Sequence, residues 1–347
     1  MTQPRTARAP RSTTRGVPGI HTARWRRNRL WVVLVAVAVA LAGCGLVSSS
    51  GTFHSGALPD GKKPLDGAKI VVTSKNFTES VLLGKIAASY LSSAGADVSD
   101  LTNAPGSASS RQAMLNGSAD LAWEYTGTAW VTYLHQTEVI ANPQQLWQQV
   151  HDAELKENQL VWLPPASFND TYAFAASGPT AKRLGVKTMS DIARLPVNER
   201  TFCVNEEFFS RPDGFLPMLN TYGIPFNTPN GVPSGNVTQM DSGVVYTAAA
   251  KGSPCNFGMV YTTDGRIKNL HLNVLEDDKH YFLPYSGTVV GRQETLEAHP
   301  EIKPLMATIS ERLTDTLMQE LNGLVDIDGQ DPADVAFNWL KSEKLVV

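Results

Sequence analysis

Two short segments combine aromatic and polar side chains at places where predicted strands end. The segment WEYTGTAW, Trp123–Trp130, completes a strand-like run DLAWEY, and its YTGT sequence has the composition of a surface turn. The segment SKNFTE, Ser74–Glu79, is expected to form the loop after the apolar strand KIVVT. Ligands of open α/β sheets bind beyond the carboxyl ends of the strands, so Lys75 and Thr128 are expected to face one crevice.

Residues that would catalyse a reaction do not form a recognisable pattern in the sequence. There is no Gly-x-Ser-x-Gly, His-Glu-x-x-His, Walker or Gly-x-Gly-x-x-Gly motif. The six histidines after residue 43 are scattered, and the acidic runs at 206–207 and 276–278 are interpreted as solvated loop charges. We therefore expect a binding protein with no enzyme activity, no cofactor and no metal. A hydrolase with a non-sequential triad and a purely structural envelope lipoprotein are the alternatives from other classes.

The elements that position the two segments alternate between strand and helix. Apolar residues with helical spacing predict a helix over Ser80–Ala94, ended by Gly95. With strands at 69–73, 98–101 and 120–125 and a second helix at 110–116, the order is βαβαβ, which predicts a mostly parallel sheet. Further elements are predicted as helices at 143–158, 188–195, 211–222 and after 300, and as strands or extended segments at 160–165, 168–177, 201–204, 256–267 and 280–290, the last possibly returning to the first sheet.

The first 43 residues are predicted to be a targeting segment. They contain eight arginines and no acidic residue, followed by an apolar run, Leu30–Leu41, shorter than a typical membrane span of about 20 residues. The run ends in Leu-Ala-Gly-Cys44, which resembles the bacterial lipobox and implies cleavage before Cys44 and lipidation of that residue. A plain signal peptide or a single-span anchor is the alternative. Residues 44–67, rich in Ser, Gly, Pro and Lys, are expected to be a flexible lipid-anchored tether.

The net charge and the cysteines bear on the partners of the protein and on its disulfide bonding. Without residues 1–43 the chain keeps 22 basic and 33 acidic residues, a net charge of −11, which disfavours nucleic acid as a partner. If Cys44 carries lipid, Cys203 and Cys255 remain as an even pair outside the cytosol, for which a disulfide is expected. No His or Cys stands near either one at metal-ligand spacing.

Five motifs in order give the chain a family resemblance. They are SKNFTES, EYTGT, RPDG, YTTDGRI and DDKHYFLPY, beginning at residues 74, 124, 211, 261 and 277. Together they resemble the substrate-binding proteins of osmoprotectant ABC transporters of the glycine betaine/carnitine/choline type, from about Lys69 to the C-terminus. The resemblance implies a type II periplasmic-binding-protein fold, α/β, with lobe I formed by 68–170 plus 284–347, lobe II by 171–283, and a ligand cleft between them.

The resemblance also implies a ligand site. A trimethylammonium group cannot donate a hydrogen bond, so aromatic ring faces would bind it. Tyr125, Tyr172, Tyr261 and Tyr285 would be the walls of this cage, and Asp170 would add a carboxylate near the cation. The ligand carboxylate would be held by Lys75, Thr128 and Arg211, since arginine suits a two-pronged grip on a carboxylate. Trp123 and Trp130 are interpreted as packing residues, and Tyr246 and Tyr281 are the neighbouring tyrosines that could take a cage position instead.

The function implied is capture and delivery. The chain would be a lipid-anchored monomer on the extracytoplasmic face of the bacterial cell membrane, which binds glycine betaine or a related quaternary amine and passes it to ABC transporter permease subunits. Choline, carnitine or an aromatic compound could occupy the same cleft, and a ligand without a carboxylate would make Arg211 dispensable. The segment 227–241 and the region of Cys255 are not expected in every family member and could reshape the rim of the second lobe.

Overall fold

The computed structural model describes residues 53–347. The predicted signal peptide (1–43), the lipidated Cys44 and the first part of the predicted tether lie outside the described residues. Within 53–347, none of the helices has the length and apolar character needed to cross a membrane.

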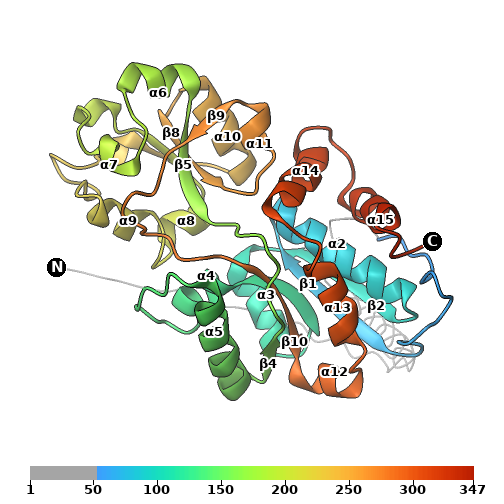
Figure 1. The fold of residues 1–347 in the computed structure, drawn as a ribbon. Coiled ribbons are helices and arrows are strands. Elements are labelled where there is room, and N and C mark those ends of the chain that lie inside the picture. The colour runs from blue at the N-terminus through green and yellow to red at the C-terminus, as the bar shows by residue number, and fades with distance from the viewer. Residues whose placement is uncertain (1–52) are drawn as a thin grey trace, which may run out of the picture. The chain divides into compact units, whose positions relative to one another are not determined.

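The first sheet has five strands in the order β2-β1-β3-β10-β4 (Figure 1). β1 pairs in parallel with β2 and β3, whereas β10 runs antiparallel to both β3 and β4. The predicted βαβαβ order and the return of the late extended segment to this sheet are therefore confirmed. The strands are β1 Lys69–Lys75, β2 Asp97–Ala104, β3 Leu121–Tyr125, β4 Leu160–Trp162 and β10 Gly287–Arg292.

Helix α2 is the central helix of lobe I. All of its residues except Thr78 and Ser92 are buried, because α13, α14 and α15 pack over the side that β1 and β2 leave free. A helix enclosed on all sides can carry a charge only if the charge is paired, and Lys85 is paired with Asp100 of β2. The helices of this lobe are α2 Thr78–Ser93, α3 Gly106–Leu115, α4 Thr126–Thr128, the π-helix η1 Ala129–Tyr133, α5 Pro143–Asn158, α12 Gln293–Ala298, α13 Ile302–Ser310, α14 Asp315–Asp326 and α15 Pro332–Ser342.

Lobe II has its own five-stranded sheet, in the order β7-β6-β8-β5-β9. Its core is rich in phenylalanine rings, with Phe202 and Phe215 at a centroid distance of 5.2 Å and Phe174 packed against both. The strands are β5 Tyr172–Ser177, β6 Phe202–Val204, β7 Val237–Gln239, β8 Phe257–Tyr261 and β9 Leu272–Val274. The helices are α6 Gly178–Leu184, α7 Met189–Ile192, α8 Glu206–Ser210, α9 Phe215–Thr221, α10 Ser242–Lys251, α11 Arg266–Asn269 and the 3-10 turns η2 Val197–Glu199 and η3 Ser234–Asn236.

The chain passes between the two sheets twice, and the two crossings lie side by side. Asn169 and Ser286 form an isolated antiparallel bridge, and the backbone N–H of Asp170 donates to the carbonyl of Tyr285 at 3.1 Å. The Asn169 side-chain oxygen in turn accepts from the N–H of Tyr285 at 2.7 Å. The two lobes are thus joined through one hydrogen-bonded pair of segments, which places Asp170 and Tyr285 between the sheets.

Two local predictions differ from the structure. The prediction of a surface turn at YTGT is wrong. Thr126–Thr128 forms the helical turn α4, which is buried and leads into η1. Thr126 can be buried there because its hydroxyl donates to the carbonyl of Pro284 at 3.0 Å, on the second crossing. Helix α3 begins at Gly106, before the start of the helix predicted at 110–116.

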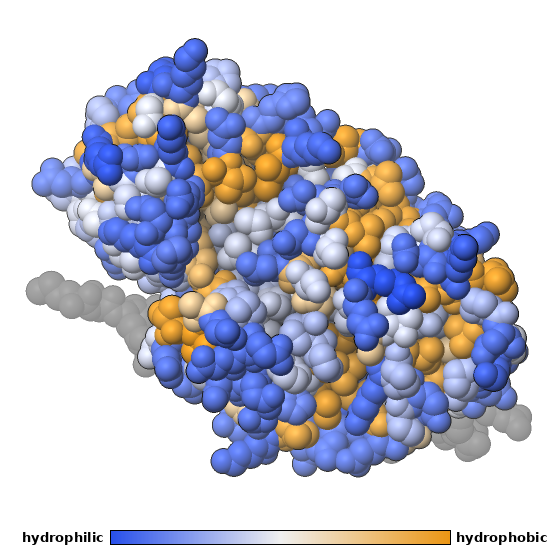
Figure 2. Space-filling view, in the orientation of Figure 1, coloured by the Kyte–Doolittle hydropathy of each residue, from blue (hydrophilic) through white to orange (hydrophobic). Residues whose placement is uncertain are grey.

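Residues 53–67 pack against lobe I. Leu58 and Leu65 are buried in the hydrophobic core, and Ala57 exchanges backbone hydrogen bonds with Val347 at the C-terminus. On the face drawn in Figure 2, hydrophobic residues are gathered in separate patches among polar ones. Residues 53–67, predicted to be part of the flexible tether, are therefore part of the folded protein.

Cys203 and Cys255 form a disulfide within lobe II, as the sequence predicts. Cys203 is the middle residue of β6 and Cys255 precedes β8, with the two Cα atoms 5.7 Å apart and both residues buried. The bond closes a loop with a sequence separation of 52 residues. It therefore ties the start of β8 to the neighbouring strand.

Removal of this disulfide is expected to destabilise the protein by about 4 kcal/mol, because a loop of roughly 50 residues would regain its conformational freedom in the unfolded chain. Unfolding of the double variant Cys203→Ala/Cys255→Ala in guanidinium chloride, compared with the wild type, measures the effect. Added reductant should lower the unfolding midpoint of the wild type and leave that of the variant unchanged. Equal midpoints for the two proteins without reductant would contradict this prediction.

Candidate ligand-binding site

One cavity between the lobes is lined by all eight residues that the sequence assigns to ligand binding. Its water-accessible space is about 20 Å³, enough for roughly one water molecule, so a larger ligand would require the side chains to move apart. Three further residues, not assigned from the sequence, complete the lining. The full set is Lys75, Phe77, Ser107, Tyr125, Thr128, Asp170, Tyr172, Glu207, Arg211, Tyr261 and Tyr285.

Two tyrosines form the lobe II side of the cavity. Tyr172 begins β5 and lies directly opposite Tyr261, the last residue of β8, so the antiparallel register brings their rings to a centroid distance of 5.3 Å. Phe77 of lobe I stacks on Tyr261, with centroids 5.3 Å apart and planes inclined by 15°. The aromatic wall is therefore continuous across the two lobes.

Tyr285 approaches the same ring from the second crossing. It meets Tyr172 edge-on at a centroid distance of 5.3 Å, and its hydroxyl donates to Asp213 at 2.5 Å. This position requires a glycine at 127, since a Cβ there would lie 2.8 Å from the ring of Tyr285 and 2.9 Å from the carbonyl of Pro284. The glycine of the EYTGT motif thus allows close approach of a ring, although the motif does not form the predicted turn.

Tyr125 lies at the end of β3, where its ring faces the cavity. The Nζ of Lys75 is 4.8 Å from the centroid of that ring, and the Tyr125 hydroxyl donates to Glu79 at 2.9 Å. Burial, together with the neighbouring Glu79 and Asp170, holds the pKa of Tyr125 well above its ordinary value, so the phenol stays protonated. The adjacent tryptophans, Trp123 and Trp130, are buried in the core, consistent with packing.

The two basic residues at the cavity are both paired with carboxylates. Lys75 Nζ lies 2.8 Å from Glu124 Oε2, and Glu124 also accepts a hydrogen bond from the hydroxyl of Tyr133 at 3.0 Å. Arg211 binds Asp213 through two nitrogens, at 2.8 and 2.6 Å. A ligand carboxylate would therefore have to share these cations with protein carboxylates.

Arg211 also links the lobes. Its Nη2 is 3.5 Å from the hydroxyl of Thr128 in lobe I, and its Nη1 is 3.3 Å from Glu207. Glu207 in turn accepts a hydrogen bond at 2.5 Å from Ser107, across the cleft. Burial opposes ionisation of Glu207, but the charge of Lys75 and the hydrogen bond from Ser107 outweigh it and lower its pKa.

Asp170 contributes a buried carboxyl to the cavity. Its Oδ1 accepts from the hydroxyl of Thr263 at 2.7 Å. Burial, reinforced by the nearby Glu79, raises the pKa of Asp170 well above its ordinary range. The carboxyl therefore favours either a proton or a cation from outside as its partner.

The residues missed from the sequence are Phe77, Ser107 and Glu207. Phe77 lies inside the quoted SKNFTE motif, so the motif itself was the available signal. Glu207 was interpreted as a solvated loop charge, which is wrong: it stands in the first turn of α8 and contacts Ser107 and Arg211 at the cavity. Tyr246 takes no cage position, because it is buried behind Tyr261. Its hydroxyl accepts a hydrogen bond from the backbone N–H of Tyr261 at 2.9 Å.

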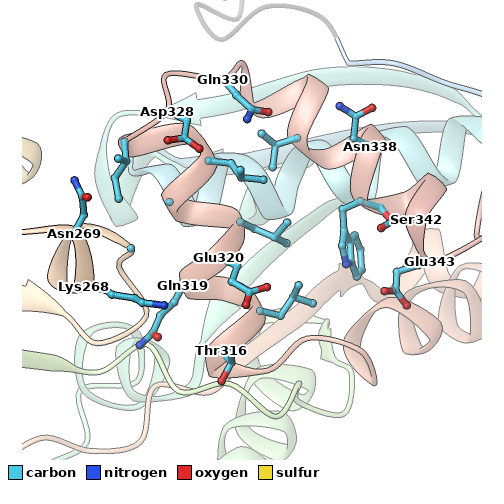
Figure 3. Close-up of a pocket in the computed structure, with 18 of the residues that line it drawn as sticks. Lys268, Asn269, Thr316, Gln319, Glu320, Asp328, Gln330, Asn338, Ser342 and Glu343 are labelled. Carbon is cyan, nitrogen blue, oxygen red and sulfur yellow. The ribbon is translucent and has the colours of Figure 1, made fainter.

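A larger hollow lies elsewhere, between α14, α15 and the turn at α11, with a volume of about 960 Å³ (Figure 3). Aliphatic side chains, among them Leu317, Leu321 and Leu324, line it together with polar side chains such as Glu320 and Asn338. Trp339 is the one tryptophan, and no tyrosine or phenylalanine occurs, among the described residues that line it. This hollow therefore lacks the facing aromatic rings that line the cavity between the lobes. Within 53–347, no cluster of His, Cys, Asp and Glu could hold a metal ion.

The fold and this cleft define a class, the type II substrate-binding proteins, with two α/β lobes joined by two crossings. A solved structure described as a glycine betaine/carnitine/choline ABC transporter matches with a TM-score of 0.65 and 27% identity, covering 79% of this chain and 98% of that chain. Among proteins of known function, the glycine-betaine-binding protein of Pseudomonas aeruginosa is 39% identical over 285 residues, 79% of this chain and 88% of its own length. The carnitine transport binding protein OpuCC of Listeria monocytogenes is 30% identical, covering 87% of this chain and 96% of its own length.

Residues 68–342 match the family described as the substrate binding domain of ABC-type glycine betaine transport systems, and the chain belongs to this family. It is thus an extracytoplasmic substrate-binding component of an ABC importer and not an enzyme.

Proposed function

We propose that this protein is a lipid-anchored binding protein that captures glycine betaine or a related quaternary ammonium osmoprotectant and delivers it to ABC permease subunits. The observation that supports the ligand class is the ring of aromatic side chains around one buried cavity. Ring faces attract a cation that has no hydrogen to donate, and each desolvated ring contributes up to about 2 kcal/mol. The names of two relatives, which specify glycine betaine and carnitine, agree with this chemistry.

Each lobe contributes its own residues to the proposed ligand site. Lobe I (68–170 and 284–347) supplies Tyr125, Lys75 and Thr128, and lobe II (171–283) supplies Tyr172, Tyr261 and Arg211. A ligand that contacts both sets stabilises closure of the lobes about the paired crossings, and the closed shape reports occupancy to the permease. Anchoring through Cys44 and a tether before Phe53 would keep the monomeric protein at the extracytoplasmic membrane surface.

A ligand without a carboxylate, such as choline, is the second candidate. The observation that favours it is the charge balance at the cavity. Lys75 and Arg211 face three carboxylates, Glu124, Glu207 and Asp213, so the cations are already neutralised. A cationic ligand would complete the balance, whereas a betaine would bring a fourth carboxylate.

Calorimetric titration of the purified protein with glycine betaine, carnitine, choline and proline tests the proposal. We expect binding of at least one trimethylammonium compound and none of proline, whose ring nitrogen carries hydrogens and would leave the aromatic cage incompletely filled. Comparison of glycine betaine with choline separates the two candidates. Absence of heat with all three trimethylammonium compounds would overturn the ligand class while leaving the family assignment in place.

A further inference from the structure

A threonine hydroxyl lies between two buried carboxyl groups at the lobe interface. Thr263 Oγ1 is 2.5 Å from Glu79 Oε2 and 2.7 Å from Asp170 Oδ1, and all three residues are buried. Glu79 is in the first turn of α2 in lobe I, Thr263 follows β8 in lobe II, and Asp170 is on the first crossing. We name this contact the carboxyl pair. It therefore joins both lobes and the segment between them.

The geometry of the carboxyl pair requires a proton. The Thr263 hydroxyl has one hydrogen and can donate it to only one of the two carboxyl oxygens. At hydrogen-bond distance, the other oxygen would meet a lone pair unless that carboxyl is protonated and donates to Thr263 itself. One of the two carboxyls, Glu79 or Asp170, is therefore protonated in this arrangement.

The other partners of Glu79 indicate where the proton resides. Its Oε1 accepts from Tyr125 at 2.9 Å and its Oε2 from the amide of Asn322 at 3.1 Å, contacts that favour the ionised form. Asp170 has fewer such donors, so the proton is best placed on Asp170. The order of donation is then Asp170 to Thr263, and Thr263 to Glu79.

The pKa values of both carboxyls are shifted in the direction that a shared proton requires. Burial raises the pKa of Glu79 to about 7, although hydrogen bonds from Thr263, Tyr125 and Asn322 oppose the rise. Asp170 is shifted in the same direction, first by burial and then by repulsion from Glu79. Two adjacent buried carboxyls are expected to share one proton and to lose it near neutral pH.

The surrounding cations do not replace the proton. Lys75 is paired with Glu124, and Arg266 is paired with Asp264 at 2.5 Å and with Asp326 at 3.2 Å. Besides the residues of these ion pairs, Tyr125 on β3 donates to Glu79, Tyr261 on β8 lies near Asp170, and the charge of Asp264, just before α11, raises the pKa of both carboxyls.

We propose that closure of the lobes takes up one proton at the Glu79–Thr263–Asp170 contact, so that these side chains are positioning residues for ligand capture. The inference rests on the proposed function, in which ligand holds the lobes closed. When lobe II moves away, Thr263 leaves Glu79, and water can solvate both carboxyls as anions. The proton is then released.

The sign of the pH effect follows from this exchange. A carboxyl whose pKa is higher in the closed than in the open arrangement stabilises closure fully below the open value, near 4. The stabilisation decreases, by at most tenfold per pH unit, as the pH rises toward the value at which the closed pair loses its shared proton, since the pKa values of Asp170 and Glu79 are both raised. Ligand affinity is therefore expected to decrease from pH 5 upward and to level off above the pKa of the closed pair.

Calorimetric titration with glycine betaine at pH 5, 6, 7 and 8 tests the carboxyl pair, since the charges of this ligand are constant over that range. In the wild type we expect at least a tenfold rise in Kd between pH 5 and pH 7. In Glu79→Gln the amide can donate to Thr263 without a titrating proton, so Kd should be independent of pH. Thr262→Val, next to Thr263, should retain the wild-type slope, because the Thr262 hydroxyl bonds only to the carbonyl of Asn169 in the described structure.

A flat wild-type profile, or a slope that persists in Glu79→Gln, would overturn the proposal. If Glu79 were only structural, its substitution would change Kd equally at every pH. A second readout is carbon-13 NMR titration of the carboxyl groups in the ligand-saturated protein, with the signals assigned by Glu79→Gln and Asp170→Asn. A carboxyl that titrates near neutral pH supports the pair, and titration of both in the ordinary range near 4 overturns it. Should glycine betaine fail to bind, choline takes its place in both experiments, since its charge is also constant over this range, and absence of binding by all three trimethylammonium compounds would overturn the proposed function itself.

Discussion

Substitution of Tyr172 by alanine should weaken binding of the quaternary amine by about 30-fold, or roughly 2 kcal/mol, because a desolvated ring face is lost. Tyr172 is expected to have the largest effect of the four tyrosines. Its ring contacts Tyr261, Tyr285 and Phe208 at centroid distances of 5.3, 5.3 and 4.7 Å, and the guanidinium of Arg211 lies 5.5 Å from its centroid. Loss of the ring therefore removes one wall and the support of two others. Titration calorimetry with the amine that binds the wild type measures the change.

Tyr172→Phe is the control for this prediction. It retains the ring and should keep Kd within about threefold of the wild type, since the cage uses the ring face and not the hydroxyl. Tyr172→Ala will also lower the free energy of unfolding by about 3–5 kcal/mol, the usual cost of truncating a buried aromatic residue. Binding must therefore be measured at a temperature where the variant is folded. An alanine variant that binds as tightly as the wild type would exclude Tyr172 from the cage.

Part of the site can be located from the order of the predicted strands alone. The parallel pairing of β1 with β3 follows from the βαβαβ pattern, and it places Lys75 and Thr128 at one edge of the sheet. Both line the cavity because a sheet edge is fixed by backbone pairing, which periodicity in the sequence can predict. This part of the site required no knowledge of distant contacts.

The carboxylates of the site could not be predicted in the same way. Glu207 is one of two adjacent glutamates, and only contact with Ser107 from the other lobe distinguishes it. Asp213 pairs with Arg211 close by in the sequence, yet it also accepts a hydrogen bond from Tyr285, which lies 72 residues away. Such roles depend on how two lobes meet, and local composition carries no record of that.

The remaining error in the predicted local structure concerns a segment that is buried. The YTGT sequence has turn composition, but its hydroxyl and glycine serve interior contacts, a hydrogen bond to the carbonyl of Pro284 and close approach of Tyr285. Polar residues with small side chains form turns at the surface and helical turns in the interior, depending on the partners that tertiary structure supplies. Those partners lie on the second crossing, more than 150 residues further along the chain.

Arg211 separates the two ligand candidates. If the ligand has a carboxylate, Arg211→Met should reduce affinity for glycine betaine by about 100-fold, the loss expected when a charged two-pronged partner is removed. Affinity for choline should then change little or improve, because Asp213 and Glu207 lose a competing cation. The measurement is the ratio of the two dissociation constants, taken by calorimetry for wild type and variant.

Arg200→Met is the matched control, since Arg200 is also a buried arginine of lobe II. Its guanidinium donates to backbone carbonyls, among them Leu195 and Ala193, and it is not among the residues that line the cavity. Both variants should lower stability, Arg211→Met by about 3–5 kcal/mol because the buried Asp213 loses its ionic partner. Only Arg211→Met should change the ratio of glycine betaine to choline affinity. An equal loss for both ligands would instead assign Arg211 to closure of the lobes through Thr128, with the carboxylate of a betaine bound by Lys75 or by no cation at all.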